Sequence, residues 1–166
     1  MALRHIAEAG RKRARRDGDF RAWLLDQAHT IRKLEGKVAR LDCAELAEEL
    51  EGMARSDERA LESLLENLLT HRLKWSFQPK RRSRSWRASV DNARSDIRNL
   101  LADSLSLKAK VATLLTRAYE KARRSAGVEM ELEERDWDKA APRACPWNFD
   151  LLLSDFWPDP VDGPPG

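Results

Sequence analysis

The chain has 166 residues, of which 42% are hydrophobic and 36% charged, and its formal net charge is +3. This length fits one domain that buries about 70% of the surface its unfolded chain would expose. No uncharged apolar run approaches the ~20 residues that span a bilayer, so no membrane partner is expected. The two cysteines, Cys43 and Cys145, form neither a disulfide framework nor a metal knuckle, and they indicate reduced thiols in a cytoplasmic protein.

The charges fall into two opposed blocks. Residues 42–66 carry nine acids against two bases, a net charge of −7, whereas residues 71–87 carry seven bases and no acid. A fold that brought the two blocks together would neutralise both of them. The sequence pI of about 9.0 therefore gives only weak support for a polyanionic partner.

Residues 1–16 form a basic arm, and the first predicted helix follows it. The arm has the Arg-rich, acid-poor composition of an organellar transit peptide, but a solvated arm is the commoner structure and is our interpretation. Asp19 is a candidate N-cap. Apolar residues then recur at spacings of three and four, with Trp23 widening the stripe, so a helix is predicted over 20–34, ending near Gly36.

The next helical pattern covers residues 42–77. Asp42 followed by Glu45 has the form of a capping box, and a long leucine stripe continues from it. The stripe falters at Gly52 and at Asp57, where an apolar residue is expected. The pattern predicts two helices, or one long helix that bends between these two positions.

Turn and capping residues divide the centre of the chain. Pro79 ends the preceding helix, because the residue before a proline avoids helical geometry. Ser83 or Ser85 can cap the next helix, whose apolar residues alternate at spacings of four and three. Ser106 is a candidate cap for a further amphipathic helix, which is expected to stop by Gly127.

The C-terminal part combines prolines with aromatic residues. Cys145-Pro146-Trp147 opens a short helix through Leu153, and Phe156-Trp157-Pro158 reads as extended chain. The segment is too apolar for a disordered tail, so we expect it to cross the helices as a strap. Residues 161–166 are expected to be loose.

Together these patterns predict an all-α fold. It is an up-and-down bundle of four to five helices with a Trp/Pro-rich C-terminal strap, in a single domain over residues 17–160. Some stripes could also extend across the interface of a homodimer. Five tryptophans are expected to be structural: Trp23, Trp75, Trp86, Trp147 and Trp157.

The candidate site is the segment 71–87, HRLKWSFQPKRRSRSWR, which we call the basic corner. Four of its residues are three or four positions apart and share one helix face. His71 and Trp75 continue a leucine stripe and should point inward, while Lys74 and Gln78 lie at its rim. With Arg82 and Arg84 as further donors, this rim could bind an anion such as a phosphate or a carboxylate, or an unidentified protein partner.

A structural interpretation uses the same residues. His71 and Lys74 would pair with Glu48 or Glu49 of the acidic block, and the tryptophans would pack across Pro79. Structural ion-pair networks readily imitate binding sites, so this interpretation is the default.

Nucleic-acid binding through the basic corner and the basic arm of residues 1–16 is an alternative, because interleaved cations and aromatics can contact phosphates and stack on bases. Against it, Trp75 and Trp86 fall on core stripes, and no nucleic-acid-binding motif occurs. A second alternative is an enzyme with His71 as acid/base, and Lys74 and Arg82 holding an anionic substrate.

Other chemistry has little support in the sequence. Asp26-x-x-His29 lacks the further carboxylates of a di-metal bundle, so no metal or other cofactor is expected. No catalytic motif occurs, and no catalytic residue is assigned. Cys43, just inside a predicted helix N-terminus, could have a lowered pKa, but a small buried filler is the default.

Several motifs resemble one bacterial family, the domain-of-unknown-function family numbered twenty-nine. They are Asp19-Phe20-x-x-Trp23-Leu24, Leu41-Asp42, Glu48-Glu49-Leu50-Glu51, His71-x-Leu73-Lys74-Trp75-x-x-Gln78-Pro79, Arg82-Ser83-x-Ser85-Trp86, Cys145-Pro146-Trp147 and Phe156-Trp157-Pro158. The resemblance runs from about residue 17 to 158. It implies an all-helical fold in a prokaryotic cytosol and carries no activity with it.

The sequence therefore predicts a protein of unknown activity, best interpreted as a non-enzymatic cytoplasmic binding protein. Its expected binding surface is the basic corner, and its partner is an unidentified protein or a small anion.

Overall fold

The computed structural model describes residues 15–161. Most of the predicted basic arm, residues 1–14, and the end of the predicted loose terminus, residues 162–166, lie outside the described residues. No helix in residues 15–161 is both long and apolar enough to cross a membrane.

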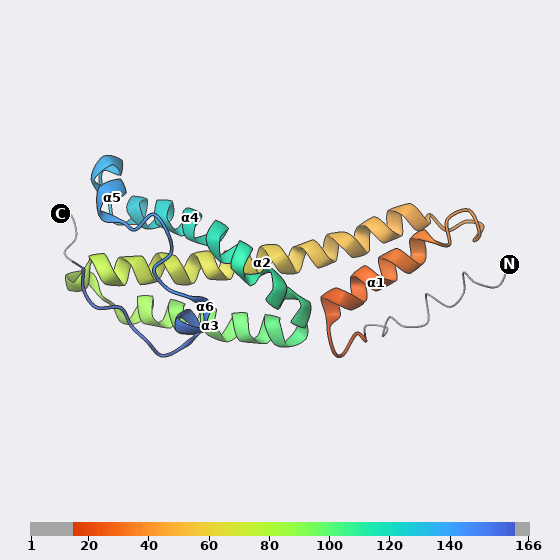
Figure 1. The fold of residues 1–166 in the computed structure, drawn as a ribbon, viewed down its shortest axis with the longest axis horizontal. Coiled ribbons are helices and arrows are strands. Elements are labelled where there is room, and N and C mark those ends of the chain that lie inside the picture. Colours follow the sequence, from red (N-terminus) through yellow and green to blue (C-terminus); the bar gives the residue numbers. More distant parts are fainter. Residues whose placement is uncertain (1–14, 162–166) are drawn as a thin grey trace.

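The described chain is all-helical, as predicted, and no strand occurs within residues 15–161 (Figure 1). Six α-helices are joined by loops and by two 3-10 helices, η1 and η2. Their bounds are α1 Phe20–Arg32, α2 Cys43–Phe77, η1 Pro79–Arg81, α3 Arg84–Asp103, η2 Leu105–Lys110, α4 Val111–Glu129, α5 Glu134–Ala140 and α6 Phe149–Leu153.

Helix α2 is the backbone of the molecule. Its 35 residues run without interruption through Gly52 and Asp57, so the two-helix alternative is wrong. The charge at Asp57 has a structural reason, because its carboxylate accepts a hydrogen bond from the Ser104 hydroxyl at 2.8 Å. At 1.5 Å per residue the helix is about 52 Å long, so its two ends lie in different surroundings.

The predicted caps are partly confirmed. Asp19 accepts from the Ala22 amide at 2.9 Å at the start of α1, and Asp42 accepts from the Glu45 amide at 2.9 Å at the start of α2. The cap at Ser106 is wrong, since this residue lies inside η2. Its amide and hydroxyl donate to the Asp19 carboxylate at 2.6 and 3.0 Å, which ties η2 to the start of α1.

The predicted end of a helix by Gly127 is also wrong, because α4 continues to Glu129. This glycine serves packing instead. A Cβ at this position would lie 2.5 Å from Cδ1 of Trp137, whose ring covers the helix there. The indole nitrogen of Trp137 donates to the carbonyl of Arg123 at 2.7 Å and so anchors the short helix α5 to α4.

The core occupies one half of the molecule. Its buried hydrophobic cluster begins at Leu61 and ends at Leu152, and it joins α2 to α3, α4 and the C-terminal segment. We call the part from Leu61 onward the body. Residues 20–54, which comprise α1, the following loop and the first third of α2, are called the arm. Figure 1 shows the arm extending away from α3, α4, α5 and α6.

Candidate functional site

The basic corner forms where α2 gives way to α3. α2 ends at Phe77, and Pro79 opens η1, in accord with the geometry that proline imposes on the residue before it. Ser83 then caps α3, its hydroxyl accepting from the Trp86 amide at 3.3 Å. The last turns of α2 and the first turns of α3 therefore lie at the same end of the body (Figure 1).

At the corner, arginine side chains lie against tryptophan rings in a cluster that we call the stack. The ring centroids of Trp75 and Trp157 are 4.3 Å apart. The Arg82 guanidinium lies 4.8 Å from the Trp75 centroid, and that of Arg87 lies 5.1 Å from the Trp157 centroid. Arg82 also donates from Nε to the Trp75 carbonyl at 3.0 Å. These cation–π contacts use the ring faces that a nucleotide base would need for stacking.

Arg72 is completely buried under this stack. Its guanidinium lies 5.5 and 5.4 Å from the ring centroids of Phe156 and Trp157, and Nη2 donates to the Leu152 carbonyl at 3.3 Å. Its Nε and Nη1 have no hydrogen-bond partner. Desolvation, followed by repulsion from Arg94, lowers the pKa of Arg72 to about 10, so the side chain is still a cation at neutral pH.

Arg94 on α3 holds the C-terminal segment from the other side. It is 3% exposed and donates to two backbone carbonyls, that of Leu152 at 3.1 Å and that of Phe156 at 3.0 Å. Its remaining nitrogen pairs with Asp91 at 2.9 Å. The sequence-distant segment 152–157 is thus bound to α2 and α3 through its main chain rather than through side-chain packing alone.

Lys74 was predicted at the exposed rim, and that position is wrong. The side chain is buried, with 8% of the residue exposed, and Nζ pairs with a carboxylate oxygen of Glu129 on α4 at 2.6 Å. Nζ also lies 4.6 Å from the ring centroid of Trp86, which makes this tryptophan part of the same structural cluster. The cation therefore links α2, α3 and α4 instead of facing solvent.

The predicted ion pairs with Glu48 and Glu49 are also wrong. Because α2 is continuous, Glu49 and His71 lie on one unbroken helix, about 33 Å apart along its axis. Both glutamates are exposed on the arm, while His71 donates from Nδ1 to the Asn67 carbonyl one turn earlier, at 2.9 Å. An internal ion pair does exist at the corner, but its carboxylate is that of Glu129 on α4.

The other predicted residues differ in exposure. Gln78 donates to the Met130 carbonyl at 3.4 Å and is half-buried, as is Arg82. Arg84 is exposed and has no ion pair within residues 15–161. Only Arg84 of the predicted rim therefore remains open to a partner. It is joined by Lys80, Arg81 and Arg87, which are exposed at the same corner.

The comparison with known families agrees with the residues from which the site is built. The family described as Domain of unknown function DUF29 matches residues 17–157. The chain belongs to this family. The resemblance drawn from the sequence motifs is confirmed, and the match includes Trp157 at the centre of the stack. No curated protein and no solved structure matches the chain.

In this DUF29 domain, the most buried charges were not singled out from the sequence. Arg72 lies inside the basic run that indicated a binding surface, and Arg94 stands alone in α3. One signal was available for Arg94, which follows the core residue Ala93 directly on a four-three stripe. Nothing in the periodicity shows that backbone carbonyls more than fifty residues later, in the C-terminal segment, accept from both arginines.

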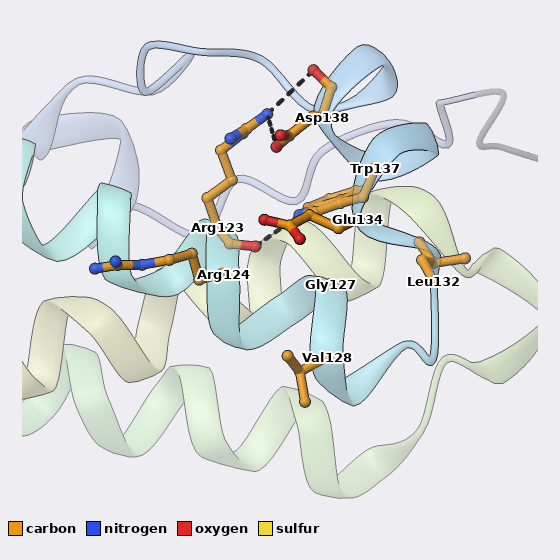
Figure 2. A pocket seen from close by; sticks show the side chains of 8 residues that line it. All are labelled: Arg123, Arg124, Gly127, Val128, Leu132, Glu134, Trp137 and Asp138. Carbon is orange, nitrogen blue, oxygen red and sulfur yellow. Dashed lines mark hydrogen bonds and ion pairs between the residues drawn. The ribbon is translucent and has the colours of Figure 1, made fainter.

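A hollow of about 290 Å³ lies beside the corner, between α4 and α5 of the DUF29 domain. Its floor is the ring of Trp137 against Gly127, and Val128 and Leu132 line one side. Figure 2 shows Arg123 turned toward Asp138, which it binds at 2.9 Å, and Arg124 pointing away from both. A neighbouring hollow of about 270 Å³ is lined by Glu120, Arg123, Arg124 and Arg143. Neither hollow is lined by His71, Lys74 or Arg82, the residues of the predicted enzyme.

The thiol of Cys43, at the start of α2, does not have the lowered pKa of a reactive cysteine. Cys43 is fully buried, and burial, followed by the charges of Glu35 and Asp42, raises the pKa of its thiol. A raised pKa disfavours the nucleophilic thiolate. The filler interpretation of Cys43 therefore holds over the reactive one.

Proposed function

We propose that this DUF29 protein is a non-enzymatic, cytoplasmic interaction protein whose basic corner binds an acidic segment of a partner protein. The observation that carries the proposal is a set of exposed cations, which we call the outer cations: Lys80, Arg81, Arg84 and Arg87. The first three have no ion pair within residues 15–161, although internal carboxylates satisfy other basic side chains of the body. Unpaired like charges on one surface favour a partner of the opposite sign.

The foundation under the outer cations supports the proposal. Arg87 lies against the Trp157 ring, and Arg82 fixes the turn through the Trp75 carbonyl. A surface held in place loses less conformational entropy on binding than a flexible one. Each exposed ion pair contributes about 0.2–1 kcal/mol, so three such pairs give on the order of 3-fold to 150-fold in affinity.

The same contacts favour an acidic protein segment over a nucleic acid or a substrate. Trp75 and Trp86 contact the cations of Arg82 and Lys74, which occupy a face of each ring on which a base would otherwise stack. His71 donates from Nδ1 to a carbonyl of its own helix, and it lines neither of the two hollows described above, so these hollows do not bring a substrate to its side chain. The outer cations are therefore the groups available for binding, and they favour a partner that carries negative charge.

The test measures binding of a short Asp/Glu-rich peptide, labelled with fluorescein, by fluorescence anisotropy. The wild type is compared with a triple variant, Lys80→Ala, Arg81→Ala and Arg84→Ala, at low and physiological salt. We expect the triple variant to lose about 3-fold to 150-fold in affinity while its thermal unfolding midpoint stays unchanged. Wild-type binding should also weaken as salt rises.

A matched control removes three exposed cations elsewhere, with Lys37→Ala, Arg59→Ala and Lys108→Ala, and so lowers the net charge by the same amount. This control should bind like the wild type. Equal losses in both triple variants would overturn the proposal, since only net charge would then matter. So would tighter binding of a single-stranded oligonucleotide than of the acidic peptide, which would favour the nucleic-acid alternative.

We further propose that the helices form an up-and-down bundle closed by residues 152–161 as a strap. Two observations support the strap: the buried donors Arg72 and Arg94 bind its carbonyls, and the amide of Val161 donates to the Ser76 carbonyl at 3.0 Å. The strap brings Trp157 under the outer cations. It therefore connects the C-terminal segment to the proposed binding surface.

A further inference from the structure

The arm is a two-helix structure with an unusually small interior. Its buried residues comprise one large side chain, Leu24, and four small ones: Ala28, Cys43, Ala47 and Ala54. None of them belongs to the main hydrophobic cluster, which begins at Leu61. Beyond the ties of Asp19 and Arg21 to Ser106 of η2 at its base, the arm extends away from α3, α4, α5 and α6 (Figure 1). A hairpin of two helices has one interface where a bundle has several.

Large apolar side chains remain exposed on the arm. Six of the ten exposed large hydrophobic residues lie between positions 25 and 53. On α2, Leu46 and Met53 are 39% and 49% exposed, and they flank the half-buried Leu50 on one helix face. On α1, Trp23 and Ile31 are partly exposed.

These residues share one side of the hairpin. On a helical wheel drawn from the N- to the C-terminus of each helix, the exposed apolar residues lie on the same rotational side of the buried residues in α1 and in α2. Two antiparallel helices related in this way present their stripes on the same face. The arm therefore carries a shallow apolar face, which we call the arm face, formed by Ile31 of α1 and by Leu46, Leu50 and Met53 of α2.

Carboxylates border the arm face. Glu45 and Glu49 are exposed and have no ion pair within residues 15–161. Glu45 and Glu49 lie one turn apart beside the apolar stripe of α2. A second copy of the chain would bring the same carboxylates to the interface and repel them, whereas Lys or Arg in the same place would pair with them.

We propose that the arm face binds an amphipathic helix of a partner protein, in which Lys and Arg border an apolar stripe. The partner helix would lie along the arm face, across α1 and α2, and convert the hairpin into a three-helix bundle. This surface is separate from the basic corner and selects the opposite charge. The inference therefore stands or falls independently of the function proposed for the corner.

The test uses two synthetic helical peptides of about 20 residues, long enough to form a helix on binding. Both carry leucines at helical spacing, and their borders are Lys in one and Glu in the other. We expect isothermal titration calorimetry to show at least about 10-fold tighter binding of the Lys-bordered peptide. The double variant Leu46→Gln, Met53→Gln should lose at least about 10-fold in affinity for it.

The control variant Val128→Gln removes an apolar side chain that is 77% exposed on α4, and it should bind the Lys-bordered peptide like the wild type. Glu45→Gln with Glu49→Gln should reduce the preference for the Lys-bordered peptide. Equal affinity for both peptides would overturn the proposal. So would a dimer in sedimentation velocity that becomes monomeric in the Leu46→Gln, Met53→Gln variant, since the occupant would then be a second copy.

Discussion

The body and the arm share helix α2 but differ in what covers it. In the body, α2 buries five leucines between Leu61 and Leu73 against α3 and α4. In the arm, the same helix buries one cysteine and two alanines between Cys43 and Ala54, against α1 alone. Because buried apolar area supplies most of the folding free energy, the body contributes most of the stability, whereas the arm keeps apolar side chains exposed.

A matched pair of leucine substitutions gives the largest expected contrast between the two regions. Leu65→Ala removes a completely buried side chain of the body and should lower the free energy of unfolding by about 2–5 kcal/mol. Leu46→Ala on the arm face should change it by less than about 0.5 kcal/mol, because that side chain is already 39% exposed. Urea denaturation followed by circular dichroism measures both, and similar losses would contradict the division into body and arm.

The next contrast concerns the arginines that hold the C-terminal segment to the body. Arg94→Ala removes two hydrogen bonds to carbonyls and the pair with Asp91, so we expect a loss of about 2–3 kcal/mol. Amide hydrogen exchange of residues 152–158 should rise at the same time. Arg98→Ala is the control, because its exposed side chain also donates to a carbonyl of this segment, that of Leu153. Its cost should stay below about 1 kcal/mol.

Much of the difference in burial between the body and the arm could be predicted from the sequence, because apolar periodicity indicates which face of a helix is buried. The leucine-rich stripe after Leu61 predicted the body's share of the core. The N-caps at Asp19, Asp42 and Ser83 were found because capping depends on residues three positions apart. The helix α5 was not predicted, because its acidic sequence holds one large apolar residue, Trp137, and so shows no apolar periodicity.

The candidate site depended on contacts that sequence periodicity does not report. Whether Lys74 meets Glu49 or Glu129 is decided by the continuity of α2 and by the side on which α4 packs. The sequence predicted a polar rim at the corner, and the structure has exposed cations there. Of the predicted rim residues, Arg84 is the one that is fully exposed, and the other exposed cations are Lys80, Arg81 and Arg87. The buried Arg72 looked like any other member of a basic run, because its carbonyl partner comes from the C-terminal segment.

The smallest expected effect at neutral pH uses the single tyrosine of the chain as a reporter of the body. Tyr119 is 2% exposed and donates to the Pro142 carbonyl at 2.7 Å. Desolvation raises its pKa from 10.0 to about 12, with the nearby Cys145 as a second cause. Ultraviolet absorbance titration should show the phenol ionising near pH 12 in the folded protein and near 10 in urea.

The sign of the stability effect follows from the raised pKa. The contribution is complete below pH 10, where the phenol is protonated in both states, and it is lost as the pH rises toward 12. Tyr119→Phe should cost about 1 kcal/mol at neutral pH and should remove this alkaline loss. The arm variant Leu46→Gln, Met53→Gln should titrate like the wild type, because no arm residue contacts the phenol. A shifted tyrosine pKa in that variant would mean that the arm and the body are not independent.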